Sequence, residues 1–318
     1  MSTILTWTRT IDSLSLVVVA APTSPLVLPS SPRTGALMAT GSMLCVQVGL
    51  AASVGLFDRI GSTGTAALRL LWAGLLLAVI ARPRPSAFTR SGVAAAAALG
   101  TVTAGLTILF TEALARIPLG TAAALEFLGP LGVALLRGRG RARGWALLAA
   151  LGVLLLTNPW QSGLDPAGVA FALAAAACWA GYILLTRRVG DQVAGLTGLG
   201  VSMPVAGLVA TIVAGPSLVG SIETGALDLS VLLAGLGIAV MLPVVPFSLE
   251  LLALRRLTTA AFGTLMCLEP AIALGVGVLF LSQTPSPAAA AGVAAVVLAG
   301  IGAERAGARR AQFSTSAS

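Results

Sequence analysis

Apolar segments follow one another with few interruptions from about residue 35 to residue 303. Charged residues make up only 9% of the chain, whereas a soluble domain carries about 25% to wet its surface. The mean hydropathy is +0.98, so most of the surface must face lipid. Lipid offers the backbone no hydrogen-bond partners, and the segments lack the alternation of β-barrel strands. The sequence therefore predicts an all-α membrane protein.

The apolar region has room for ten transmembrane helices of roughly 20 residues each. We predict spans at residues 35–56, 63–81, 92–111, 121–136, 144–158, 166–185, 195–213, 229–252, 258–281 and 285–303. Residues 1–34 and 304–318 are interpreted as cytoplasmic tails. The spans between them form two five-helix units, residues 35–160 and 161–303.

The arginines predict the orientation of these spans. All 19 basic residues are Arg. With the N-terminus in the cytoplasm, sixteen of them fall on the inside and only Arg59 and Arg116 on the outside, while Arg69 lies within the second span. An excess of basic residues in cytoplasmic loops is the rule for membrane proteins, so both termini are predicted to be cytoplasmic. The same distribution attributes the net charge of +8 to topology, and we expect no nucleic-acid partner.

One stretch of the chain is repeated. Residues 113–130 align without gaps onto residues 253–270, at an offset of 140, with six of eighteen positions identical. Both copies run from the predicted third to fourth, or eighth to ninth, span. Since five spans is an odd number, the second copy must be inverted in the membrane, a plan that transporters use with a substrate site near the midplane.

Two acids lie near the middle of predicted spans, Glu126 in the fourth and Glu269 in the ninth. An ionisable group in lipid costs at least about 2.5 kcal/mol, so it usually faces a cavity or a partner. In repeat coordinates Glu269 matches Gly129, three residues from Glu126 and thus on the same helix face. We expect both acids to face one central cavity, where one binds a substrate ammonium group or takes up a proton. The alternative is a structural Glu that bridges helices.

Other charged residues allow two interpretations each. Glu112 and Arg116 have the i, i+4 spacing of a helix-end salt bridge, and an outer gate is the alternative. Glu250, at the inner end of its span, is open to the same two interpretations. Arg69 is the only deeply placed cation, and it could hold a substrate carboxylate, pair with a buried Glu or extend to the interface.

Gln47, Trp179 and Tyr182 are candidates for lining the cavity, although aromatic residues in membrane helices often only anchor at an interface. Trp72 and Trp145 are interpreted as such anchors. The chain has no His, and its three cysteines lack the spacing of a metal site, so we expect no metal, no cofactor and no enzyme activity.

Several segments together resemble a known family. They are residues 65–70 (TAALRL), 117–130 (IPLGTAAALEFLGP), 177–184 (ACWAGYIL), 246–250 (PFSLE) and 262–270 (FGTLMCLEP). They are similar to the threonine/homoserine exporter branch of the drug/metabolite transporter superfamily, of the EamA type. The resemblance implies ten helices in two EamA repeats and proton-driven amino-acid efflux across the inner membrane.

The resemblance also implies a set of site residues: Gln47, Arg69, Glu126, Trp179, Tyr182, Glu250 and Glu269. The chain departs from the family pattern at Ser282-Gln283, where Gly-Glu is common, and at Phe247, where Tyr is frequent. The first departure puts an acid-dependent gate in doubt. The expected partners are a small polar metabolite, protons and the lipid bilayer. Export of another polar or drug-like metabolite is the alternative within transporters, and a membrane-embedded enzyme or non-transporting scaffold is the alternative outside them.

Overall fold

The computed structural model describes residues 32–82, 89–137, 142–157, 164–190, 199–254, 256–257 and 259–315, and within these ranges it contains helices and no strand. In chain order the helices are α2 (Pro32–Val54), α3 (Phe57–Ala81), α4 (Arg90–Leu114), α5 (Leu119–Glu126), α6 (Leu128–Arg137), α7 (Ala142–Thr157), α8 (Pro166–Gly190), α9 (Leu199–Val213), α10 (Gly215–Glu223), α11 (Leu229–Ala239), the π-helix η3 (Val240–Val244), α12 (Val245–Leu254), α13 (Thr259–Met266), α14 (Glu269–Leu281) and α15 (Pro287–Thr315).

Five helical segments are long and apolar enough to cross a membrane, or six if the bent pair α9–α10 counts as one span. Four further apolar segments are 10–17 residues long: Leu119–Val133, Gly144–Leu156, Leu229–Leu242 and Pro287–Gly302. The structure therefore agrees with an all-helical, multi-span protein.

Two of the predicted spans are broken at equivalent places. The fourth splits into α5 and α6 at Phe127, and the ninth splits into α13 and α14 just before Glu269. Pro130 and Pro270 lie inside the first turns of α6 and α14, just after the breaks. Each break comes directly after the residue four positions before the proline, which is Glu126 or Met266. The proline has no N–H to donate to the carbonyl oxygen of that residue, and its ring clashes with the same carbonyl.

Other departures from the predicted spans have local causes. The predicted loop after residue 213 contains α10, which turns away from α9 by 68°. The helix α15 continues to Thr315, beyond the predicted end of the span at 303, since its arginines can remain helical outside the apolar region. The N-terminal tail was predicted to reach residue 34, but α2 begins at Pro32, and residues 1–31 lie outside the described residues.

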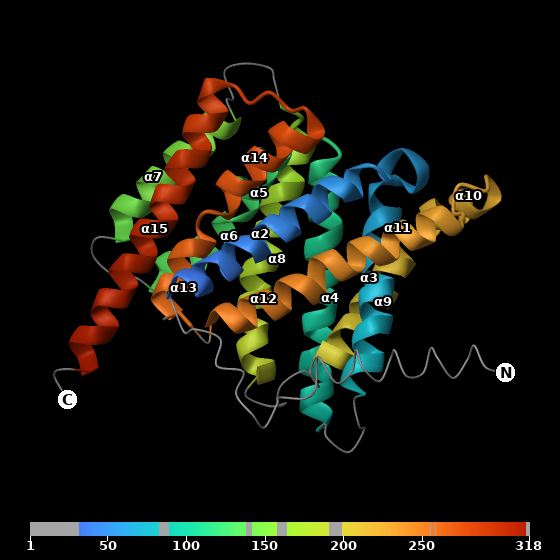
Figure 1. Cartoon of the computed structure of the whole chain (residues 1–318), viewed down its shortest axis with the longest axis horizontal. Helices are drawn as coiled ribbons and strands as arrows, with labels where there is room; N and C mark the ends of the chain where they lie inside the picture. Colours follow the sequence, from blue (N-terminus) through green and yellow to red (C-terminus); the bar gives the residue numbers. More distant parts are fainter. Residues whose placement is uncertain are drawn as a thin grey trace.

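Small residues allow the helices to approach closely, which is how helices associate in lipid. A Cβ placed on Gly100 of α4 would lie 2.3 Å from the Ser202 carbonyl oxygen of α9. Where α7 crosses α15, a Cβ on Gly152 would come within 2.9 Å of the Gly292 carbonyl oxygen. Figure 1 shows α7 and α15 running side by side at one end of the molecule, while α3 and α9 pack together towards the other.

The contacts between helices come in matching sets. α4 packs on α8 as α2 packs on α12, and α5 and α6 contact α8 as α13 and α14 contact α2. Three further contacts join matching spans of the two predicted five-helix units: α3 with α9, α7 with α15, and α5 with α14. In the last of these, the first half of the fourth span meets the second half of the ninth.

Candidate functional site

Glu126 is the last residue of α5, at the break before α6. Its carboxyl group interacts electrostatically with Glu269, the first residue of α14, and with Arg69 in α3. Burial strips water from these side chains, but none of them is fully covered. The two acids from the two predicted five-helix units thus interact through their charges, and the deep arginine interacts with one of them.

Gln47 of α2 connects to this group. Its side chain is 1% exposed, and its Nε2 donates to Glu269 Oε1 at 3.2 Å. Gln47 Oε1 has no hydrogen-bond partner among the described residues. An unpaired buried acceptor costs about 1–3 kcal/mol, so its free oxygen is available for a donor from a bound molecule.

Glu250 of α12 is a third acid next to α2, nearer the start of that helix than Gln47. Ser42 Oγ donates to Glu250 Oε1 at 2.8 Å and lies 3.3 Å from the Pro246 carbonyl oxygen. The charge on Glu250 also interacts with that of Glu269. Ser42 is fully buried, and sequence reasoning missed it because a lone serine in an apolar span carries no signal of its own.

Side chains of α2 can bond to the backbone of its neighbour because that neighbour contains the π-helix η3. A π-turn leaves backbone carbonyls without their usual partners. Cys45 Sγ lies 3.4 Å from the Met241 carbonyl oxygen in η3, one turn along α2 from Ser42. Polar side chains of α2 thus compensate for the irregular backbone of its neighbour.

The aromatic candidates lie on α8. Trp179 packs edge-on against Phe127, the residue at the α5–α6 break, with ring centroids 6.4 Å apart and an interplanar angle of 78°. Trp179 therefore packs on the α5–α6 break that follows Glu126. Tyr182, one turn further along α8, is half-buried.

The chemistry available here is that of three carboxyl groups, one guanidinium and one free amide oxygen. Carboxylates bind ammonium groups, whereas a guanidinium binds a carboxylate through its fork of donors. No group of three His, Cys, Asp or Glu that could hold a metal occurs in the described part of the chain. The arrangement suits a small zwitterion.

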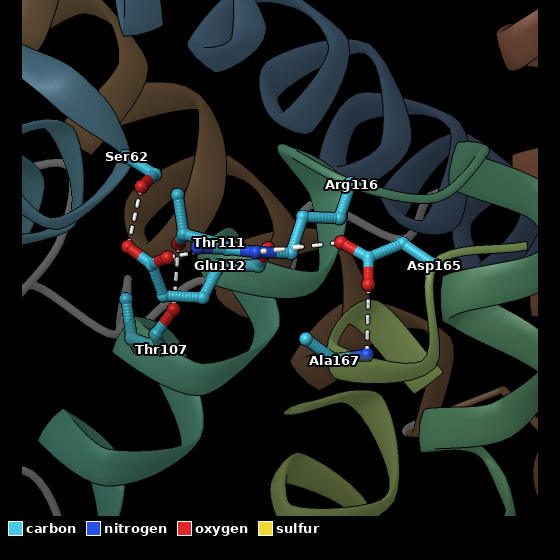
Figure 2. A network of polar contacts seen from close by, with 7 residues as sticks. All are labelled: Ser62, Thr107, Thr111, Glu112, Arg116, Asp165 and Ala167. Carbon is cyan, nitrogen blue, oxygen red and sulfur yellow. Dashed lines mark hydrogen bonds and ion pairs between the residues drawn. The ribbon is translucent and has the colours of Figure 1, made fainter. Parts of the chain in front are cut away.

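Glu112 and Arg116 lie apart from this centre, at the α4–α5 turn (Figure 2). Arg116 Nη1 donates to the Glu112 carboxylate, and to the Glu112 carbonyl oxygen at 2.7 Å. The other Glu112 oxygen accepts from Ser62 of α3. Arg116 Nε lies 3.8 Å from Asp165 Oδ2, before α8, and its guanidinium stacks 4.9 Å from the Phe171 ring centroid. The cluster ties α3, α4 and α8 together at one end.

This cluster predicts a stability effect. Arg116→Gln should lower the apparent melting temperature in detergent by about 2–4 °C, because the partly buried Glu112 loses its counter-charge. Arg59→Gln is the matched control, since its pair with Asp228 is more exposed and should contribute less. Equal shifts for the two variants would contradict the prediction. A loss of transport at unchanged stability would instead assign the cluster to a gate.

Asp228, at the start of α11, forms a second ion pair that sequence reasoning missed. Arg59 Nη2 lies 2.9 Å from Asp228 Oδ2. Hydrogen bonds from the Ser230 hydroxyl, the Val231 N–H and Arg59 hold the pKa of Asp228 well below its usual range. The pair therefore stays charged as the pH falls through the mildly acidic range. Both arginines predicted to lie outside are thus engaged in ion pairs.

Membrane-crossing helices with ionisable side chains gathered between them define a membrane protein that handles polar solutes. Residues 166–303 match the EamA-like transporter family. The threonine/homoserine exporter RhtA of Escherichia coli (strain K12) is 35% identical over 266 residues, which are 82% of this chain and 88% of that protein. The protein of the same name from Salmonella typhimurium (strain LT2) is 37% identical over the same shares. One solved structure is 19% identical to this chain, and the match spans 85% of this chain and 96% of the solved one. Its TM-score of 0.49 is too low to carry weight.

The chain belongs to the EamA-like transporter family, in the branch that contains the threonine/homoserine exporters. The family match covers the second of the two predicted five-helix units, and the similarity to the exporters extends across most of the first as well.

Proposed function

We propose that this protein exports small amino acids of the threonine and homoserine kind across a bacterial inner membrane, in exchange for protons. The names of its relatives support the substrate class. The observation that carries the proposal is the meeting of Glu126, Glu269 and Arg69, which come from three different helices. An amino acid would place its ammonium group at the acids and the free oxygen of Gln47, and its carboxylate at Arg69.

Proton exchange is supported by the balance of charges. Three carboxyl groups interact in series, Glu250 with Glu269 and Glu269 with Glu126, beside a single guanidinium. Like charges that interact in a poorly hydrated site are costly. Two of the three acids therefore need a proton or a substrate ammonium, so the two cargoes compete for the same carboxyl groups.

Ten spans are proposed for the whole chain. The five long helices, the bent pair α9–α10 and the four shorter apolar segments together correspond one by one to the ten predicted spans. The shorter segments Leu119–Val133 and Leu229–Leu242 continue into α6 and α12, which adds to their length.

Two inverted repeats are proposed as the moving units. α5 and α13 both have eight residues, and their bounds differ by the same 140 positions as the sequence repeat. The turn before each helix is repeated as well: Arg116 Nη1 donates to the carbonyl oxygen four residues earlier, and so does Arg256 Nη1. Gly168 at the start of α8 packs on the first turn, as Gly35 at the start of α2 packs on the second. Alternating access follows if the repeats exchange these environments, with both termini in the cytoplasm.

Transport in everted vesicles tests the proposal. Vesicles containing the protein should accumulate labelled threonine or homoserine when a pH gradient is imposed, and a protonophore should abolish this. A panel of amino acids, purines and cationic dyes defines the specificity. Accumulation of dyes but not of amino acids would replace the substrate class. Equal uptake with and without the gradient would remove proton exchange.

A further inference from the structure

Gln283 follows α14 and connects it to α5. In the sequence it stood out only as a departure from the family pattern, and it is not among the predicted site residues. Gln283 Oε1 accepts from the Leu119 N–H at 3.0 Å, the first residue of α5. Its own N–H donates to the Gly277 carbonyl oxygen at 3.1 Å, which holds it against the last turn of α14. The helices joined by this side chain carry the two central acids, Glu126 at the end of α5 and Glu269 at the start of α14.

Glycines bring the two helices into close contact at this same end. A Cβ on Gly120 would lie 2.7 Å from Leu274 Cα, and one on Gly277 would lie 2.6 Å from Gln283 Oε1. Thr121, the next residue of α5, is only 3% exposed. The α5–α14 contact thus covers the end of the molecule that also carries Arg116 and Asp165.

The equivalent helix pair, α13 and α6, packs differently from α5 and α14. The offset of 140 makes α13 equivalent to α5, and α6 equivalent to α14. Within the described residues α13 and α6 share no extended contact with one another, whereas each of them packs on α15. One fold with two equivalent helix pairs therefore has one pair closed and the other pair apart.

We propose that Gln283 is the gating residue that holds α5 and α14 together and closes the outer end of the substrate pathway. The inference rests on the proposed alternating access and adds to it the contact that changes. In the opposite state α13 and α6 would come together, and the bond between Leu119 and Gln283 would break. Because the side chain is an uncharged amide, closure at this end does not depend on protonation of the gating residue itself.

Accessibility of a reporter thiol tests the gate without any need for substrate. Cys45, Cys178 and Cys267 are replaced by Ala, and Thr121→Cys places a thiol at a buried position of α5. Intact cells are then treated with a membrane-impermeant maleimide. Gln283→Leu should increase the labelling rate about fivefold, the effect of losing one hydrogen bond of ordinary strength. Gln283→Glu keeps an acceptor for the Leu119 N–H and should label as slowly as the parent.

Ser286→Ala is the matched control. Ser286 Oγ accepts from the Ala289 N–H at 3.1 Å, so it caps α15 in the same loop without joining α5 to α14. Its loss should leave labelling unchanged. In transport, Gln283→Leu should raise the KM for substrate on the cytoplasmic side much less than it raises labelling, because a fivefold gain in a minor outward-open state removes only a small share of the inward-facing molecules.

Two results would overturn the gate. The first is an unchanged labelling rate in Gln283→Leu. The second is an equal rise in labelling for Ser286→Ala, which would mean only that the loop is loosened. If amino acids prove not to be transported, the proposed substrate fails, but the labelling result still decides the role of Gln283.

Discussion

Glu126→Gln should reduce threonine export by between about 10- and 100-fold, the loss expected when a charge-assisted interaction is removed. Glutamine keeps the volume and hydrogen-bonding capacity of the side chain, so the end of α5 should fold as before. What it removes is the negative charge that interacts with Arg69 and Glu269, together with the capacity to carry a proton. Because substrate and proton are proposed to share this carboxyl group, substrate exchange and proton-driven efflux should both fall.

Two reference measurements sharpen this result. Glu223→Gln changes an exposed acid at the end of α10 and should leave transport intact. Exchange of labelled for unlabelled substrate without a pH gradient separates binding from coupling. Retained exchange with lost net efflux would limit Glu126 to the proton and move the ammonium to Glu269. If Glu126→Gln transports at wild-type rates that still respond to the pH gradient, the central role of Glu126 is wrong.

Gly129→Ala should be the most destabilising single-methyl change in the described helices around the site. A Cβ on Gly129 would lie 2.2 Å from the Ala176 carbonyl oxygen, and backbone cannot rotate out of the way. Separating α6 from α8 should cost about 3 kcal/mol, at the upper end of typical overpacking. It should also displace the break that positions Glu126, so transport should fall with stability.

Gly132→Ala, one turn further along α6, is a matched control because nothing lies within 4 Å of its added methyl group. Alanine is favoured over glycine within a helix by roughly 0.5–1 kcal/mol, so this variant should be as stable as the wild type or slightly more so. Thermal unfolding in detergent compares the two variants. Equal melting temperatures would show that α6 and α8 can separate at little cost.

Gly129 also explains why the two halves carry their acids at different positions. It occupies the place that corresponds to Glu269 in the second half, and the α8 backbone fills the space that a side chain would need. Glu126 occupies the place that corresponds to Met266. The repeat therefore predicted where an acid was possible in each half, but the packing of α8 decided where one could fit.

Several features were predictable from local sequence because their causes are local. Low charge and long apolar runs require helices in lipid, since the backbone has no other partners there. Pro130 and Pro270 determine the breaks in two helices through the carbonyls four residues before them. The spacing of Glu112 and Arg116 was enough to pair them within one helix end.

The contacts between helices could not be obtained in this way. Gln47 meets Glu269 across 222 positions of the chain, and Leu119 meets Gln283 across 164. In a soluble helix the apolar face marks the side that is buried, but here lipid-facing and protein-facing sides are both apolar. Composition and the lengths of the apolar runs by themselves determined a helical membrane protein with several spans. Only the tertiary structure decided which side chains of distant helices meet, because those contacts depend on how small residues let particular helices approach.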